Sequence, residues 1–275
     1  MGSLTMTQEE VVTRQRERPA PALRETPDTG THANQVFDVH WARDEAEVRE
    51  AQRLRYEVFA MEMGARLAPS AGAPPGHDVD RFDDYCEHLL VRTLNQRREV
   101  VGTYRVLTPE AARRAGGLYS ESEFDISRVR PLLATAVELG RSCVHPDWRS
   151  GGVVMALWAA LGAFMLRHRL DAMIGCASIG MRDGGHAAAS LWARLRQSHL
   201  ASAEWQATPY RPLPVDALRQ DLDPEVPALI KGYLRCGAKV LGPPAWDEDF
   251  NTADLPLMMR FADLPSRYRK HFLSR

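Results

Sequence analysis

The sequence predicts an α/β protein in which a mixed central sheet is flanked by helices. Two observations indicate this fold. Segments with alternating apolar residues are interleaved with segments of helical period, so strands and helices follow one another along the chain. The most apolar stretch, residues 153–166, follows a predicted strand directly through a loop that contains Gly151 and Gly152. Apolar residues make up 44% of the 275 residues, which is enough to build a full core at this length.

The individual elements follow from the two periodicities. Alternation identifies the strands, which are expected at residues 36–41, 88–93, 99–107, 136–144, 172–179 and 255–261. Helical spacing identifies the helices, which are expected at residues 44–63, 153–166, 186–198, 224–236 and 265–272. Asp44 and Glu47 are spaced as a capping signal for the first helix. Residues 69–76 are expected to form a flexible loop, and residues 109–115 belong to a less regular stretch.

Charge and cysteine content narrow the class of protein. The formal net charge of −1 argues against a nucleic-acid partner. The four cysteines form no Cys-x-x-Cys pair, so we expect free thiols in a cytoplasmic protein. Residues 153–166 are shorter than the roughly 20 residues that cross a bilayer. Residues 1–35 lack both a secretory signal and apolar periodicity, so we expect a disordered tail before a single domain at residues 36–275.

The most informative stretch leads from the strand at residues 136–144 through a loop into the apolar helix. The free N–H groups and partial positive charge of a helix N-terminus suit a phosphate. Gly151 and Gly152 would let the backbone approach such a group closely, and Arg149 could add a charge-assisted hydrogen bond. The alternative is a turn that binds no ligand, because a Gly-Gly turn alone is a weak motif.

The order of the elements, taken with this loop, resembles the GCN5-related N-acyltransferase fold. The resemblance implies that the strand before the loop separates from its neighbour and pairs with the pantetheine arm of a thioester donor. Residues 149–154 read Arg-Ser-Gly-Gly-Val-Val, so the second glycine comes earlier than in the family pattern Q/R-x-x-G-x-G/A. This departure favours an acyl carrier protein, which carries one phosphate on its pantetheine, over coenzyme A as donor.

Several segments resemble one branch of this fold more closely. The segments LRYEVF at 54–59, DRFD at 80–83 and GTYRVL at 102–107 resemble the acyl-homoserine-lactone synthases. A more specific similarity is to the bacterial ornithine N-acyltransferases that make lyso-ornithine lipid. It is carried by GLYSESEFD at 117–125, ELGRSCVHP at 138–146, GCAS at 175–178, KGYLR at 231–235 and FNTAD at 250–254. This resemblance implies 3-hydroxyacyl-acyl-carrier protein as donor and the α-amine of ornithine as acceptor, with no metal or further cofactor.

Acyl transfer to an amine benefits from a base, because amines are mostly protonated at neutral pH. Glu138 lies on the strand before the loop, where the resemblance places the reacting carbonyl group, so we expect it to be the catalytic base. Burial there would raise its pKa toward a useful range. The alternatives are that Glu138 forms an ion pair with Arg105 or Arg141, and that His145 or a water molecule is the base.

Strand alternation assigns faces to the residues around Glu138. It places Glu138, Gly140 and Ser142 on one face and Leu139, Arg141 and Cys143 on the other. Ser142 is therefore expected to contact the substrate with Glu138. Backbone N–H groups near Cys143 and Val144, with Gly151 and Gly152, are expected to bind the thioester and its oxyanion. Cys143 itself is expected to pack rather than to act as a nucleophile, because direct transfer needs none.

Asp80, Asp83 and Arg105 are the predicted acceptor-binding residues. Two aspartates three positions apart ordinarily indicate a solvated acidic loop, but the resemblance favours contact with the cationic acceptor. Arg105 lies within an apolar strand and is costly there unless it is paired. It could therefore bind the carboxylate of the substrate or neutralise Glu138 or an aspartate.

Basic residues in the second half of the chain suggest partners of opposite charge. They include Lys231, Arg235, Arg194, Arg196, Arg267, Arg269 and Lys270. Such a surface could steer an acidic acyl carrier protein, contact anionic lipid heads at the membrane, or simply be solvated. Two alternatives for the function stay open: a related synthase of N-acyl amino acids or acyl-homoserine lactones with another acceptor, and a non-catalytic module that binds the carrier protein or lipid.

Overall fold

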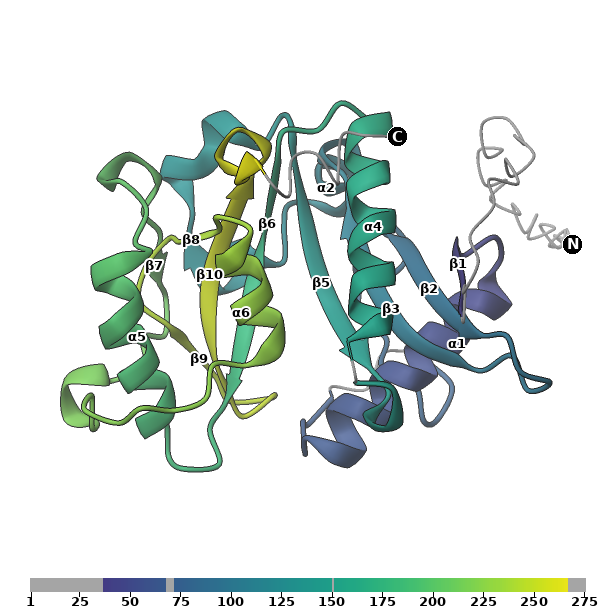
Figure 1. Ribbon diagram of the computed structural model, residues 1–275, viewed down its shortest axis with the longest axis horizontal. Coiled ribbons are helices and arrows are strands. Elements are labelled where there is room, and N and C mark those ends of the chain that lie inside the picture. Colours follow the sequence, from purple (N-terminus) through teal and green to yellow (C-terminus); the bar gives the residue numbers. More distant parts are fainter. Residues whose placement is uncertain (1–36, 68–71, 150, 267–275) are drawn as a thin grey trace, which may run out of the picture. The chain divides into compact units, whose positions relative to one another are not determined.

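The computed structural model describes residues 37–67, 72–149 and 151–266. The predicted tail at residues 1–35 and residues 267–272 of the predicted last helix lie outside the described residues. The main sheet consists, in spatial order, of β1 (Phe37–Trp41), β2 (Glu87–Thr93), β3 (Val100–Leu107), β5 (Ala136–Val144), β6 (Ala172–Gly180), β10 (Thr252–Arg260) and β8 (Lys239–Val240), with β9 (Ala245–Asp247) also on β10. A separate two-stranded sheet pairs β4 (Phe124–Asp125) with β7 (Thr208–Pro209). This mixed sheet with helices on both faces confirms the predicted fold class (Figure 1).

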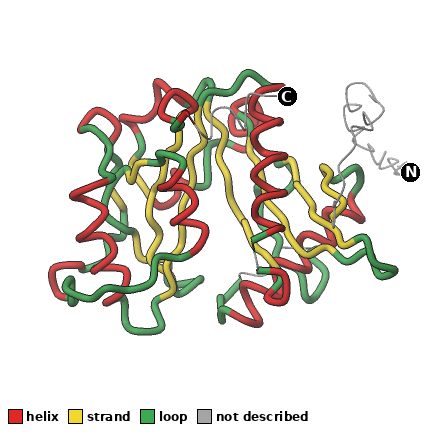
Figure 2. The backbone as a smooth tube through the Cα atoms, in the orientation of Figure 1, coloured by secondary structure: helices red, strands yellow, loops and turns green. Residues whose placement is uncertain are grey.

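Between the named strands of the described main sheet, the one parallel pairing joins β5 and β6. It covers three residue pairs, in which Ala136–Glu138 align with Ala172–Ile174. Beyond them β5 continues along β3 and β6 continues along β10, so the two strands diverge toward the start of α4 (Gly152–Arg167) (Figure 2). The separation implied by the family resemblance is thus present. Among the described residues, the stretch 139–144 has no partner strand on the side of β6.

Gly175 marks the point at which the two strands part. A Cβ atom on this residue would lie 2.4 Å from the carbonyl oxygen of Leu139, a separation that real Cβ atoms do not adopt. Glycine is therefore required for the two backbones to approach so closely. The close approach at Gly175 and Leu139 closes one end of the separation, and the start of α4 lies at the open end.

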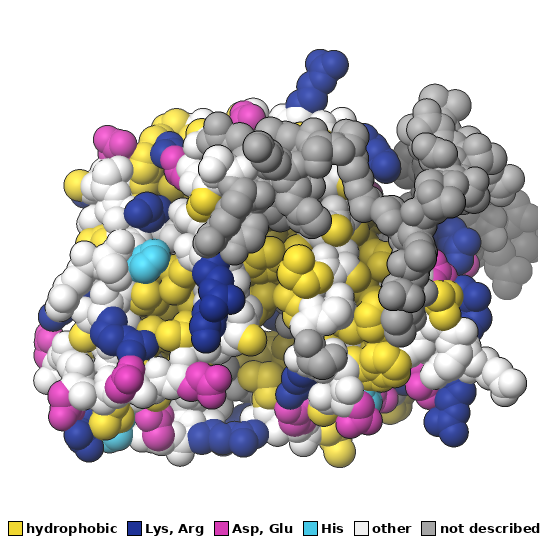
Figure 3. Space-filling view, viewed as in Figure 1, with side chains coloured by type: hydrophobic (Ala, Val, Ile, Leu, Met, Phe, Trp, Pro, Cys, Tyr) yellow, Lys and Arg dark blue, Asp and Glu magenta, His cyan; other side chains and the backbone are white. Residues whose placement is uncertain are grey.

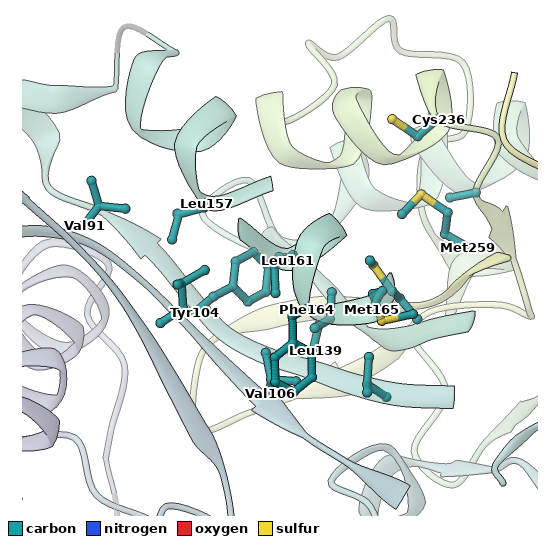
Figure 4. Close-up of a cluster of buried hydrophobic side chains, with 14 of the residues drawn as sticks. Val91, Tyr104, Val106, Leu139, Leu157, Leu161, Phe164, Met165, Cys236 and Met259 are labelled. Atoms are coloured by element: carbon teal, nitrogen blue, oxygen red, sulfur yellow. The ribbon is translucent and has the colours of Figure 1, made fainter. Parts of the chain in front are cut away.

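Helices cover both faces of the sheet. One face carries α4, α5 (His186–Ser198) and α6 (Ala228–Arg235), and the other carries α1 (Glu45–Tyr56) with its π-helical continuation Glu57–Glu62, α2 (Pro109–Ala115) and α3 (Ser120–Glu123). In Figure 1, α4 and α6 stand in front of the sheet and α1 lies behind it. The α4 face holds a core cluster in which Leu157, Leu161, Phe164 and Met165 pack on Tyr104, Val106 and Leu139 (Figure 4).

The apolar stretch predicted as a helix at residues 153–166 is α4. Its inner face is in the core, but Met155 on its outer face is 57% exposed. Among the helices that the structure describes, none combines the length and the apolar character that crossing a membrane requires.

Capping residues explain where two of the helices begin. The side chain of Asp44 accepts a hydrogen bond from the N–H of Glu47 at 3.0 Å, which confirms the predicted start of α1. The expectation that residues 109–115 are irregular is wrong, because they form α2. Thr108 caps this helix, Pro109 occupies its first turn and Gly116 ends it in the left-handed conformation. A seven-residue helix is too short for apolar periodicity to reveal, so only these end signals could have predicted it.

A β-bulge at Arg141 reverses the faces predicted for the end of β5. Arg141 has a φ of +48°, and two residues of β5 oppose Tyr104 of β3 at this point. As a result Cys143 shares the α1 face with Glu138, while Ser142 turns to the α4 face and hydrogen-bonds with Tyr104. The predicted alternation is therefore wrong beyond the bulge, because the extra residue shifts the period by one.

Replacement of Gly175 tests whether the close approach of β5 and β6 is required. We expect Gly175→Ala to lower the free energy of unfolding by about 2 kcal/mol or more, because the Cβ atom must push backbone atoms apart. Gly180→Ala, on the same strand with nothing within 4 Å of the added Cβ, should change it by less than about 0.5 kcal/mol. Urea unfolding of the two variants provides the measurement, and equal losses would contradict the expectation.

Candidate active site

A cavity of about 530 Å³ opens on the face of the sheet that carries α1, α2 and α3. Four segments meet there: the loop before β2, the turn into α3, the bulge of β5, and β9 with the turn that follows it. The lining residues that matter below are Asp80, Tyr119, Glu123, Arg141, Asp247 and Phe250. The guanidinium of Arg141 lies 4.6 Å from the ring centre of Phe250 and 5.3 Å from that of Tyr119. The wall therefore presents both signs of charge beside aromatic surface.

A buried ion network holds the loop before β2 against the sheet. Arg55 of α1 is fully buried, with Nε 2.7 Å from Asp78 Oδ2 and Nη1 2.7 Å from Asp83 Oδ1. Its Nη2 donates to the carbonyl oxygen of Asp78 at 2.6 Å. Burial acts to raise the pKa of Asp83, but the guanidinium groups of Arg55 and Arg105 hold that pKa well below its usual range. Asp83 is therefore ionised and fully committed to these partners.

Arg105 and Arg141 extend the network to the cavity. Nη1 of Arg105 lies 2.6 Å from Asp80 Oδ1 and 3.3 Å from Asp83 Oδ1. Arg141 reaches the same loop, with Nε 3.1 Å from Asp78 Oδ2 and Nη2 3.1 Å from Asp80 Oδ2. Burial acts to raise the pKa of Asp80, but Arg105 and Arg141 keep it below its usual value. The bulge at Arg141 makes this contact possible, because it turns the side chain toward the acidic loop.

These contacts decide between the interpretations of the acidic loop. It is not a solvated charge run, because Asp83 is 6% exposed and both aspartates are paired with arginines. For Arg105, the alternative that it neutralises an aspartate is confirmed. Contact between the acceptor and Asp80 or Asp83 stays a prediction. Asp80 lines the cavity, whereas Asp83 lies behind it.

Glu138 anchors the turn that leads into α3. Its carboxylate accepts hydrogen bonds from the N–H of Tyr119 at 2.6 Å and from the N–H and Oγ of Ser120 at 2.7 and 2.5 Å. Burial raises the pKa of Glu138 although these hydrogen bonds oppose the rise. The alternative ion pair with Arg105 or Arg141 is absent from the described residues. The role of Glu138 as a base stays a prediction, and three donors already occupy its two oxygens.

The predicted phosphate loop lies at the open end of the separation between β5 and β6. Gly151 precedes α4 with a φ of +102°, no side chain caps the helix, and Gly152 is exposed. Arg149 forms a two-pronged ion pair with Glu62, with N–O distances of 2.6 and 2.7 Å, and donates to the carbonyl oxygen of Val144. Arg149 therefore fastens the loop to the π-helical segment, and the glycines leave the helix end open.

The remaining predicted residues of this stretch pack or cap. Cys143 is buried against α1 and its π-helical continuation, and burial raises the pKa of its thiol, so a nucleophilic thiolate is disfavoured. Val144 packs on the α4 face. His145 accepts a hydrogen bond from the N–H of Asp147 at 3.3 Å and does not line the cavity.

Sequence reasoning missed three residues that meet beside the cavity, of which Glu123 lines it. A side-chain oxygen or sulfur atom of each of Glu123, Cys176 and Asp254 lies within 4.8 Å of the other two. The sequence does contain a signal for Asp254. Because β10 begins at Thr252, three residues earlier than predicted, Asp254 lies inside a strand, where a charged side chain is costly unless it has a function. Glu123 ends a four-residue helix, where no period can single it out.

Substitution of Asp83 tests the buried network. We expect Asp83→Asn to lower the free energy of unfolding by about 3–5 kcal/mol at pH 7, because Arg55 and Arg105 lose a buried counter-charge. The depressed pKa of Asp83 stabilises the fold above the unfolded-state pKa of about 3.9, so the difference from the wild type should shrink as the pH falls below that value. The exposed neighbour provides the control: Asp84→Asn should change stability by less than about 0.5 kcal/mol.

Known proteins resemble this chain in sequence and in fold. Residues 54–159 match the family model described as Acetyltransferase (GNAT) domain. The chain is 39% identical over 253 residues to the L-ornithine N(alpha)-acyltransferase of Agrobacterium fabrum, covering 86% of this chain and 85% of that protein. It is 37% identical to the protein of the same name from Brucella abortus, with coverage of 86% and 88%. FeeM, an N-acyl amino acid synthase from uncultured soil microbes, has a similar fold, with a TM-score of 0.50 at 10% identity over 83% of this chain and 94% of that one.

The fold and the separated strands define an N-acyltransferase of the GNAT class, which confirms the predicted enzyme class. The identity to curated relatives is high enough, over most of both chains, to be more specific. The chain belongs to the L-ornithine N(alpha)-acyltransferase family.

Proposed function

We propose that this enzyme transfers a 3-hydroxyacyl group from the phosphopantetheine thioester of acyl carrier protein to the α-amine of ornithine, giving lyso-ornithine lipid. The observation that carries the proposal is the separation of β5 from β6, which has an open helix end at its mouth and a cavity of mixed charge beside it. The names of the relatives support ornithine as the acceptor.

The donor side of the proposal rests on backbone groups. Residues 139–144 have no partner strand on the side of β6. Their free N–H and C=O groups can therefore pair with the amides of a pantetheine arm, in the way that an added strand would pair with them. The uncapped N–H groups at Gly152 suit a single phosphate. Arg149 is engaged with Glu62, so less positive charge is free for the pyrophosphate of coenzyme A. These features support acyl carrier protein as the donor.

The acceptor side rests on the cavity. The presence of Arg141 on the wall supports binding of the carboxylate of an amino acid there, and the acidic residues of the wall support binding of its ammonium groups. In the transfer, the amine nitrogen bonds to the thioester carbon and loses a proton, the C–S bond breaks, and the carrier leaves as a protonated thiol. N–H groups on the free edge of β5, the stretch that includes Cys143 and Val144, can stabilise the intermediate oxyanion.

Partner binding is proposed on the face formed by α4, α5 and α6. Hydrophobic side chains are visible in the middle of this face, with Lys and Arg side chains beside them (Figure 3). Lys231 and Arg235 belong to α6, and Arg194 of α5 pairs with Asp223. The charges support docking of an acidic carrier protein and peripheral contact with anionic lipid. Of the predicted basic residues, Arg267, Arg269 and Lys270 lie outside the described residues.

A substrate panel tests the proposal. The purified enzyme is incubated with 3-hydroxyacyl-carrier protein or the matching acyl-coenzyme A, and with ornithine, lysine, 2,4-diaminobutyrate or S-adenosylmethionine. We expect kcat/KM to be at least about tenfold higher for ornithine and for the carrier-protein donor, because each unmatched charged contact costs about 1.4 kcal/mol or more. Mass spectrometry identifies the product.

The products also separate the alternatives. A lactone formed from S-adenosylmethionine, or faster acylation of another amino acid, would replace ornithine as the acceptor. Equal rates with coenzyme A and carrier protein would contradict the argument from the glycine spacing and from Arg149.

A further inference from the structure

Two carboxylates without a counter-charge meet where β5 and β6 part. Glu123 comes from α3 and Asp254 from β10, and their nearest oxygens lie within 4.8 Å of each other and of the Cys176 sulfur on β6. Cys176 directly follows Gly175, the residue at which the two backbones touch. The Glu123–Asp254 pair therefore lies next to the closed end of the strand separation, on the cavity side of the sheet.

Charge compensation distinguishes this pair from the acids of the loop before β2. Asp78, Asp80 and Asp83 are each held by arginines. In the described part of the chain, no lysine or arginine forms an ion pair with Glu123, Asp247 or Asp254. The negative charge of the Glu123–Asp254 pair is thus unbalanced, although the acidic loop before β2 is neutralised.

Hydrogen bonding sets Glu123 apart from Glu138. Three donors hold the carboxylate of Glu138, and Asp254 accepts from the Oγ1 of Thr252 at 2.8 Å. Both oxygens of Glu123 are shielded from solvent and accept no hydrogen bond of good geometry, although the hydroxyl of Tyr119 lies close by. A buried acceptor with no donor is costly unless a ligand supplies one. Glu123 also belongs to the lining of the cavity, so this acceptor lies at the cavity wall.

The surroundings make the pair hold a proton near neutral pH. Burial and repulsion from Asp254 raise the pKa of Glu123 to about 8, and burial with repulsion from Asp247 raises that of Asp254 to about 6. The ionisable groups that face the pair from the neighbouring elements are Tyr119, Glu138, Arg141, Cys176 and Asp247. Arg141 favours the ionised form, and the acids oppose it.

We propose that the Glu123–Asp254 pair receives the α-ammonium group of the acceptor and takes its proton, so that the neutral amine can attack the thioester. This inference rests on the proposed function. The N–H bond breaks with its electron pair left on nitrogen, the proton passes to a carboxylate oxygen of the pair, and the C–N bond then forms as the C–S bond breaks. Glu138 is in this scheme a positioning residue, because it holds the turn that carries Tyr119 and Glu123.

pH–rate profiles of single variants test the proposal. The pair must lose a proton to act, so kcat/KM of the wild type for ornithine should rise with pH along an acid limb set by the pair and then level off. In Glu123→Gln and Asp254→Asn, kcat/KM at pH 7 should fall by about 100-fold or more. The loss of kcat/KM should shrink as the pH approaches the pKa of the acceptor's own amine, because hydroxide in solution then deprotonates the amine without the pair.

Glu110→Gln is the matched control. It removes one negative charge from the exposed first turn of α2, which does not line the cavity, and it should change kcat/KM by less than about threefold with an unaltered pH profile. If the two pair variants keep the wild-type profile, or if they raise only KM with no change in kcat or in the acid limb, the proton-acceptor role is overturned. If the wild type does not acylate ornithine at all, the proposed function fails instead, which separates the two results.

Thermal unfolding checks that the variants fold. An acid with a raised pKa adds no penalty below its unfolded-state pKa and destabilises the fold as the pH rises through its folded-state pKa. The melting temperature of Glu123→Gln should therefore rise relative to that of the wild type as the pH increases from about 5 to about 8. A constant difference across this range would show that Glu123 is ionised throughout, and the proton-acceptor role would be withdrawn.

Discussion

The guanidinium group of Arg55 is completely buried, and the rest of the site follows from the need to neutralise it. A buried charge is tolerated only with counter-charges and hydrogen bonds around it, and Asp78 and Asp83 supply both. Their pairing draws the loop before β2 onto the sheet, and this loop brings Asp80 to the cavity wall. Arg105 and Arg141 then balance the added acids. One helix residue thus determines where the acidic loop lies and which of its carboxylates remain available to a ligand.

Periodicity predicted most of the fold but little of the chemistry of the site. The long strands and α1, α4 and α5 have strong apolar periods, so their positions were predicted within a few residues. Features shorter than one period were not predicted. The start and end of α2 are determined by its capping residues. The bulge depends on the positive φ of Arg141, which the residue type does not predict. Asp80, Asp83 and Arg105 were grouped as acceptor-binding residues, which stays a prediction, and sequence spacing could not show that they bind one another. That depends on Arg55, which is 25 positions away from the nearer of these two aspartates along the chain.

Glu138 and Glu123 show why residue type alone could not identify the role of a carboxylate. Both are shielded acids with raised pKa values near the same strands. The backbone of the turn into α3 donates to Glu138 and leaves Glu123 without a donor. The carboxylate of Glu138 thus has all its hydrogen-bond donors within the protein. The carboxylate of Glu123 lacks a donor, and a bound amine could supply one. The difference lies in the path of residues 119–123, within the stretch between β3 and β5, whose sequence has no regular pattern.

The bulge at Arg141 has a consequence for how related chains can diverge. Losing the extra residue would restore regular alternation and leave the later side chains on their present faces, whereas losing a residue while the bulge is retained would turn every later side chain to the opposite face. The second kind of deletion would send Cys143 toward α4 and Val144 toward α1, and loss of Arg141 itself would remove its guanidinium group from the acidic loop. Insertions and deletions should therefore be excluded from this strand while substitutions are tolerated at many of its positions. In an alignment of the family, the length of this strand should be more constant than its composition.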